Sequence, residues 1–168
     1  MDCYRITKYN PIYRDSNGVY TNEEWTAVSD VGTQYSGTVF TFGDYLRYEN
    51  AYISAIRITM KLNAVTQLQL SGLEKKHTID CPDILEQSCI EYIGKISNGD
   101  FVDYSNIDFC IRLMLREMMW GKLVSRNMFI HFGYDYYMYI GSCEKLNTGL
   151  DTISSLGLFL EKMVSPYL

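Results

Sequence analysis

Residues 128–141 read Met-Phe-Ile-His-Phe-Gly-Tyr-Asp-Tyr-Tyr-Met-Tyr-Ile-Gly, and this stretch decides the fold class. Two extended runs, Met128–Phe132 and Tyr136–Ile140, stand on either side of three residues that include Gly133. Two strand-like runs joined by about three to five residues with a glycine are typical of a β-hairpin. The stretch therefore predicts two antiparallel neighbours in a sheet.

The second run of this hairpin distributes its tyrosines over both faces of the strand. Tyr137 and Tyr139 share one face, because successive side chains of a strand point to opposite sides. The whole chain is rich in this residue, with 15 tyrosines in 168 residues. A tyrosine suits a covered sheet, where its hydroxyl finds a partner, and it also suits the centre of a protein interface. Tyr137 and Tyr139 are thus either core residues or aromatic anchors for a partner.

The rest of the chain mixes strands and helices. Extended patterns predict three further strands, at residues 3–9, 67–72 and 158–164. Helical spacing with start or stop signals predicts four helices, at residues 42–60, 82–98, 105–120 and 146–156. The third of these, closed by Gly121, is so apolar that we expect it in the middle of the protein. Since the order shows no sustained βαβ alternation, we predict α+β: a single domain, residues 1–168, with an antiparallel or mixed sheet and packed helices.

The composition is that of an ordinary globular protein. Apolar residues make up 47% and charged residues 21% of 168 residues, which suits one domain. The first ten residues lack the apolar segment of a signal peptide, and no apolar run reaches the roughly 18 residues of a membrane span. We therefore expect a cytoplasmic protein that makes no membrane contact.

The cysteines predict neither disulfides nor a metal site. The five cysteines are scattered and odd in number, unlike the even, patterned set of a secreted disulfide framework. A zinc site would require a closely spaced pair of cysteine or histidine ligands, and the sequence contains none. We expect reduced thiols and no cofactor.

No motif in the chain identifies a reaction. The sequence has no glycine-rich phosphate loop, no G-x-S-x-G turn and no H-E-x-x-H pair. His131 alternates with apolar residues, which predicts a histidine packed in a strand, and His77 follows two lysines in a polar connection. Asp135 is the carboxylate that a small hydrolase would use, but a hairpin turn explains it more simply. We predict no enzymatic activity and keep a carboxylate-dependent hydrolase as an alternative.

The net charge of −5 is concentrated in part of the chain. Residues 78–110 hold seven acidic residues and one lysine. Four of these acids precede or follow Pro82, where a helix is predicted to begin, and they avoid its apolar stripe: Asp80, Asp83, Glu86 and Glu91. Solvation and the helix dipole explain such a face, and so does the attraction of a basic partner. Direct binding to nucleic acid is not expected, because 20 acidic residues outnumber 15 basic ones.

Three segments carry a resemblance to a known class of proteins. They are YRITKYNP at residues 4–11, EEWTAVSDVG at 23–32 and GLFLEKMVSPYL at 157–168. They resemble segments of bacterial immunity proteins from contact-dependent growth inhibition and other polymorphic toxin systems. The resemblance implies a cytoplasmic protein that binds a cognate toxin domain, often a nuclease, and neutralises it by covering its active site. It supplies no catalytic residue.

The charge pattern and the resemblance lead to one functional prediction. We expect an immunity protein that binds a basic toxin domain through acidic, tyrosine-rich surface contacts. The partner-binding residues predicted from the sequence are Asp80, Asp83, Glu86, Glu91, Tyr137 and Tyr139. A scaffold or regulator that binds a protein other than a toxin remains the first alternative.

Overall fold

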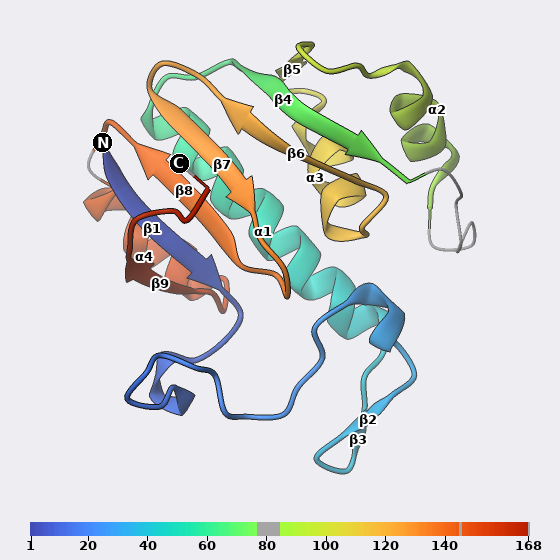
Figure 1. The fold of residues 1–168 in the computed structure, drawn as a ribbon, viewed down its shortest axis with the longest axis vertical. Coiled ribbons are helices and arrows are strands. Elements are labelled where there is room, and N and C mark those ends of the chain that lie inside the picture. The colour runs from blue at the N-terminus through green and yellow to red at the C-terminus, as the bar shows by residue number, and fades with distance from the viewer. Residues whose placement is uncertain (77–84, 145, 168) are drawn as a thin grey trace.

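The computed structural model describes residues 1–76, 85–144 and 146–167. Its main feature is a seven-stranded sheet in the order β5-β4-β6-β7-β8-β1-β9, in which neighbours run antiparallel (Figure 1). The strands are β1 (Asp2–Thr7), β4 (Gln67–Lys75), β5 (Phe101–Asp103), β6 (Met119–Val124), β7 (Met128–Phe132), β8 (Met138–Ser142) and β9 (Phe159–Lys162). The predicted α+β class with an antiparallel sheet is confirmed.

Helices cover one side of this sheet. They are α1 (Phe42–Leu62), α2 (Gln87–Lys95), α3 (Ile107–Leu115) and α4 (Asn147–Ser155). Helix α1 runs behind the middle of the sheet, with α3 and α4 on either side of it (Figure 1). We call the sheet face toward these helices the inner face and the opposite one the outer face. Within the described ranges, no helix has the length and apolar character needed to cross a membrane.

The segment between β1 and α1 contains only short elements. These are two 3-10 turns, Pro11–Tyr13 and Val28–Asp30, and a small ladder of β2 (Gln34–Tyr35) with β3 (Thr38–Val39). The segment leads into α1 through a capping box, in which the Asp44 backbone N–H donates to the Thr41 hydroxyl at 3.1 Å. The helix start predicted from this spacing is confirmed.

The hairpin formed by β7 and β8 is confirmed, with one change in its bounds. Ile130 pairs with Ile140, and His131 pairs with Tyr139. Strand β8 begins at Met138 rather than Tyr136, because Asp135 and Tyr136 adopt positive φ angles of 55° and 62°. The connecting turn is therefore longer than the predicted one.

The prediction of one helix from residue 105 to Gly121 is wrong. Helix α3 ends at Leu115, Glu117 turns the chain with φ 58°, and the chain continues as β6. Both elements are rich in apolar residues, so the sequence does not show where helical spacing changes to the alternating spacing of a strand. Gly121 serves strand packing instead, since a Cβ there would lie 2.9 Å from the Cδ1 atom of Leu70.

The predicted start of helix α2 is also wrong. Pro82 lies outside the described residues, but Glu86 has extended backbone angles and the helix begins at Gln87. It ends at Lys95, before the predicted stop at Asn98. Strand β9 and helix α4 agree with their predictions, and Gly157 ends the latter with φ 83°.

The core lies between the inner face and α1. It includes fully buried side chains of the sheet and of α1, such as Ile6, Leu70, Ile130, Tyr45 and Ile56. A buried ion pair lies beside them. The Glu49 carboxylate accepts bonds from Arg116 Nε and Nη2, both at 2.7 Å, and from the Tyr45 hydroxyl at 2.8 Å.

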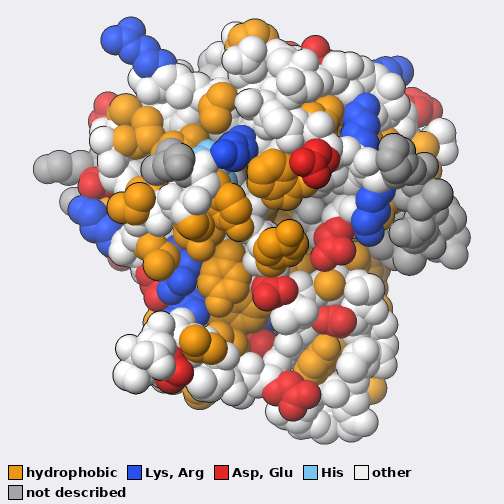
Figure 2. Space-filling model, in the orientation of Figure 1, with side chains coloured by type: hydrophobic (Ala, Val, Ile, Leu, Met, Phe, Trp, Pro, Cys, Tyr) orange, Lys and Arg blue, Asp and Glu red, His pale blue; other side chains and the backbone are white. Residues whose placement is uncertain are grey.

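The outer face is partly covered by the segment 163–167. The Ser165 hydroxyl lies 3.0 Å from Nδ1 of His131, and the Lys122 ammonium donates to the carbonyl oxygen of Tyr167 at 2.6 Å. Tyr167 then packs edge-on against Tyr139. Hydrophobic side chains gather over the middle of this face, with acidic side chains beside them (Figure 2).

Candidate functional site: a pocket beside the β7–β8 turn

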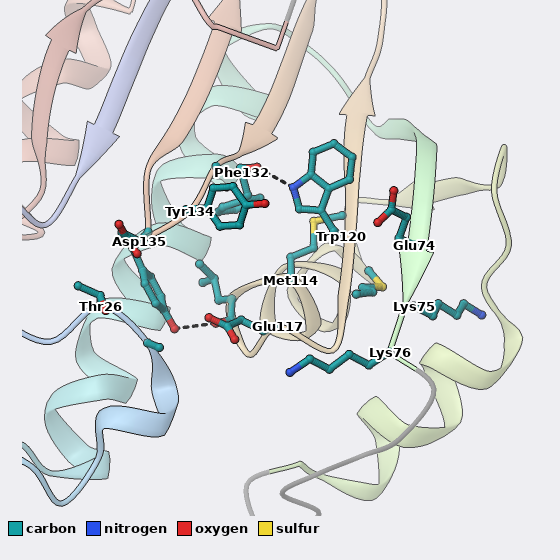
Figure 3. A pocket seen from close by; sticks show the side chains of 15 residues that line it. Thr26, Glu74, Lys75, Lys76, Met114, Glu117, Trp120, Phe132, Tyr134 and Asp135 are labelled. Carbon is teal, nitrogen blue, oxygen red and sulfur yellow. Dashed lines mark hydrogen bonds between the residues drawn. The ribbon is translucent and has the colours of Figure 1, made fainter.

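A pocket of about 400 Å³ opens where five segments meet: the β7–β8 turn, the start of β6, the end of β4, the end of α3 with the turn after it, and residues 26–27 of the segment before α1. Figure 3 shows it from close by. We call it the hairpin pocket. Its apolar walls come from Met114, Met119, Trp120, Phe132, Tyr134 and Tyr136. Its acidic side chains are Glu74, Glu117 and Asp135, each from a different segment.

The buried side chain of Tyr136 anchors the β7–β8 turn. The Tyr136 hydroxyl donates to the carbonyl oxygen of Leu115 at 2.6 Å, and the Tyr52 hydroxyl donates to the carbonyl oxygen of Tyr136 at 2.7 Å. Left-handed backbone in residues with a side chain costs about 1–3 kcal/mol each, so the turn depends on these bonds. The same turn leaves the side chain of Tyr134 89% exposed. The hairpin therefore presents one exposed aromatic ring on an anchored turn.

Trp120 has a fixed orientation in the pocket wall. Its indole N–H donates to the carbonyl oxygen of Phe132 at 2.8 Å, across the sheet (Figure 3). Its ring is half-buried and lies edge-on to Tyr167, with 6.4 Å between centroids. A side chain held from two sides loses little freedom when a ligand packs against it. The indole thus forms a ready-made flat surface.

The two lysines at the end of β4 point in different directions. Lys75 extends away from the pocket and donates to the carbonyl oxygens of Ile93 and Ile96, both at 2.6 Å. Lys76 extends into the pocket (Figure 3), and its backbone N–H donates to the carbonyl oxygen of Met118 at 2.9 Å. The acidic side chains of the pocket therefore face one ammonium group from this pair.

Of the four acidic residues predicted to face a partner, the two that the structure describes, Glu86 and Glu91, do not line this pocket. Asp80 and Asp83 lie outside the described residues. Glu86 is exposed at the start of α2, 3.8 Å from a guanidinium nitrogen of Arg112. Glu91 is exposed on the same helix. Their role toward a partner stays a prediction.

Tyr137 and Tyr139 are on the predicted shared face, but both are engaged within the molecule. Tyr137 is half-buried, and its hydroxyl accepts a bond from Nη1 of Arg14 at 3.1 Å. Tyr139 is only 7% exposed and packs against Tyr167. Among the tyrosines of this hairpin, Tyr134 at its tip is the exposed one. The sequence offered a signal for this, because the tip of a hairpin loop is exposed whichever face the strands bury.

His131 is packed in its strand, as its alternation with apolar residues predicts. Its side chain is 2% exposed, and it stacks on Phe129 with ring centroids 4.4 Å apart. Burial is the main cause that lowers the pKa of His131 to about 4, and the positive charge of Lys122 contributes to this shift. The imidazole is therefore neutral at physiological pH.

Neither a metal-binding cluster nor a similar protein identifies the chemistry of the site. The described residues contain no cluster of three or more histidine, cysteine or acidic side chains that could hold a metal ion. Cys3, Cys89, Cys110 and Cys143 are free thiols. Comparisons with family models, with curated proteins and with solved structures found no match to the chain.

Proposed function

We propose that this protein is a cytoplasmic immunity protein that binds a basic toxin domain and neutralises it. The observation that carries the proposal is the hairpin pocket, where three acidic side chains surround fixed aromatic rings beside the exposed Tyr134. Tyrosine and tryptophan dominate the energetics of protein interfaces, because they bring a large contact area with few rotatable bonds. Acidic groups nearby steer a basic partner toward that surface.

The anchoring of the turn supports recognition of a protein. Tyr136 is buried and bonded at both its hydroxyl and its carbonyl group, so Tyr134 is presented in a defined position before any partner arrives. A preorganised contact avoids much of the entropy cost of association. An immunity protein that must act quickly and bind tightly benefits from both properties.

One observation favours the alternative of a small hydrolase. Asp135 shares the pocket with Glu74 and Glu117, and a carboxylate in a pocket is a group that can act in general acid–base catalysis. The open mouth beside Tyr134 favours binding over catalysis, since an active site gains from excluding water. Turnover of nitrophenyl ester or glycoside substrates, lost in Asp135→Asn, would support the hydrolase instead.

The proposed function is tested by co-expression with the product of the gene immediately upstream. The expected result is a stable one-to-one complex with a basic toxin domain, together with rescue of growth in cells that produce this toxin. Absence of both the complex and the rescue would overturn the proposal. Capture of a protein that has no toxic activity would instead support the scaffold or regulator.

A further inference from the structure

The acidic side chains of the hairpin pocket stand on three separate segments. Glu74 belongs to β4, Glu117 follows α3, and Asp135 lies in the β7–β8 turn. All three are exposed residues, so their carboxylates are open to a ligand in the pocket. Figure 3 shows them around the pocket rather than together, so a ligand bonds to one of them directly and feels the charge of the others. A guanidinium group has five N–H donors in one plane, and it can stack on an aromatic face while its edge bonds to a carboxylate. An ammonium group is a compact point charge and has no plane with which to stack on a ring.

The apolar wall of the pocket fits the other parts of an arginine side chain. Tryptophan is the ring to which cations bind best, and the indole of Trp120 is held in place by its bond to Phe132. Met114 and Met119 line the same pocket. Their flexible thioethers can pack along the methylene stem of a long basic residue.

The chain itself already places a cation in this pocket. Lys76 is one of the lining residues, and its side chain extends into the pocket (Figure 3). The bond of its backbone N–H to Met118 fixes the base of this side chain. The pocket thus accommodates a basic group of the protein itself. A basic group of a ligand would have to displace Lys76, which repels it.

From these contacts we infer that the hairpin pocket binds an arginine side chain of the partner. The Lys76 side chain occupies the pocket until the partner binds. The inference rests on the proposed function, because the arginine belongs to the toxin domain. It adds the chemical group that is recognised, and it assigns Lys76 as a competitor that lowers the affinity.

The test uses a capped Gly-Arg-Gly peptide as the probe, with Gly-Gln-Gly and Gly-Lys-Gly as comparison peptides. The readout is the pair of indole N–H signals in a ¹H–¹⁵N NMR spectrum, since the chain has two tryptophans. Trp120 lines the pocket, whereas Trp25 is buried against Phe40 and serves as an internal reference. We expect the arginine peptide to shift the Trp120 signal to saturation, the lysine peptide to bind more weakly, and the glutamine peptide to leave the signal unchanged.

Variants of exposed residues test the assignment without disturbing the core. Glu117→Gln and Asp135→Asn should each weaken arginine-peptide binding, and by about tenfold for the carboxylate that bonds to the guanidinium directly. Lys76→Met should strengthen it, because the competing ammonium is removed. Asp151→Asn, on the exposed surface of α4, is the matched control and should change nothing.

The outcomes separate this inference from the proposed function. Equal binding of the glutamine or lysine peptide, or weaker binding in Lys76→Met, would overturn the arginine assignment. If the wild type binds and neutralises a toxin domain and all three pocket variants do so equally well, the function stands and the inference fails. If the arginine peptide binds as expected but no toxin partner exists, the pocket assignment stands and the proposed function fails.

Discussion

The hydroxyl group of Tyr52 joins the central helix to the turn at the pocket. It donates to the carbonyl oxygen of Tyr136 at 2.7 Å and accepts the backbone N–H of Lys8 at 2.9 Å. One buried oxygen atom of α1 therefore connects the end of β1 with the β7–β8 turn. The shape of the candidate site depends on a residue that does not line it.

Removing this hydroxyl should lower stability and loosen the turn. Tyr52→Phe leaves the Lys8 N–H without its buried acceptor, which costs about 1–3 kcal/mol of unfolding free energy. Urea unfolding measures this loss, and hydrogen exchange at the amides of residues 133–137 measures the loosening. Tyr48→Phe, at a half-buried position of the same helix, is the control and should change stability by less than about 0.5 kcal/mol. Equal stability of the two variants would contradict the role assigned to Tyr52.

Breaking the buried ion pair should have a larger effect. Glu49→Gln removes the charge that Arg116 contacts with two nitrogens at 2.7 Å, so a buried guanidinium loses its counter-charge. Loss of one partner of a buried pair costs about 3–5 kcal/mol. Glu86→Gln removes an exposed carboxylate 3.8 Å from Arg112 and should cost less than about 1 kcal/mol. Denaturant unfolding of both variants checks the difference.

His131 should make the protein less stable in mild acid. Its pKa is about 4 in the folded protein and ordinarily 6.5, so between these values the unfolded chain binds a proton that the folded protein does not. Stability therefore falls as the pH falls from 6.5 toward 4, by about 2 kcal/mol between pH 7 and pH 5 from this group alone. Urea unfolding at both pH values should show a smaller decrease for His131→Gln than for the wild type. An equal decrease would show that other groups govern the acid sensitivity.

A methyl group at Gly141 should not fit. A Cβ atom there would lie 2.0 Å from the Cε1 atom of Phe129, its neighbour on the adjacent strand. Gly141→Ala should lower the unfolding free energy by about 1–3 kcal/mol, because the ring must move. Gly94→Ala has open space in helix α2 and should raise it by about 0.5–1 kcal/mol. Thermal unfolding of the pair tests both signs.

Tyr134 should matter for binding and hardly at all for stability. Tyr134→Ala removes a ring that is 89% exposed, so unfolding should change by less than about 0.5 kcal/mol. Its affinity for the toxin domain should fall by at least about tenfold, as for an interface anchor. Phe101→Ala removes another exposed ring, 59% exposed on strand β5 away from the pocket, and is the matched control. Equal affinities of the two variants, measured by calorimetry, would place the interface elsewhere.

Much of the fold was predictable from local patterns. The hairpin around Gly133, the capping box at Thr41 and the end of α4 at Gly157 all carry short-range signals, and all are confirmed. The boundary between α3 and β6 was not predictable in this way. Buried helices and buried strands are both continuously apolar, so only the turn at Glu117, held by packing, separates them.

The candidate site was predictable only in part. The sequence singles out Asp135 as a candidate carboxylate because it lies among tyrosines, and in the structure it lines the pocket. Glu74, Glu117 and Trp120 join it through strand pairing and through the turn after α3. No local pattern encodes these long-range neighbours. The burial of Tyr139 was equally hidden, because Tyr167 from the far end of the chain packs against it.

The position of β1 in the sheet has a consequence for how the chain acquires its structure. This strand is the first in sequence, yet it lies between β8 and β9, which are formed by residues 138–142 and 159–162. During synthesis on the ribosome, β1 leaves the exit tunnel early and must wait for both of its neighbours. Contacts of such high sequence separation slow folding, because a long loop must close before they form. The hairpin of β7 and β8 is formed by local contacts, whereas β1 joins the sheet only through contacts between residues far apart in the sequence.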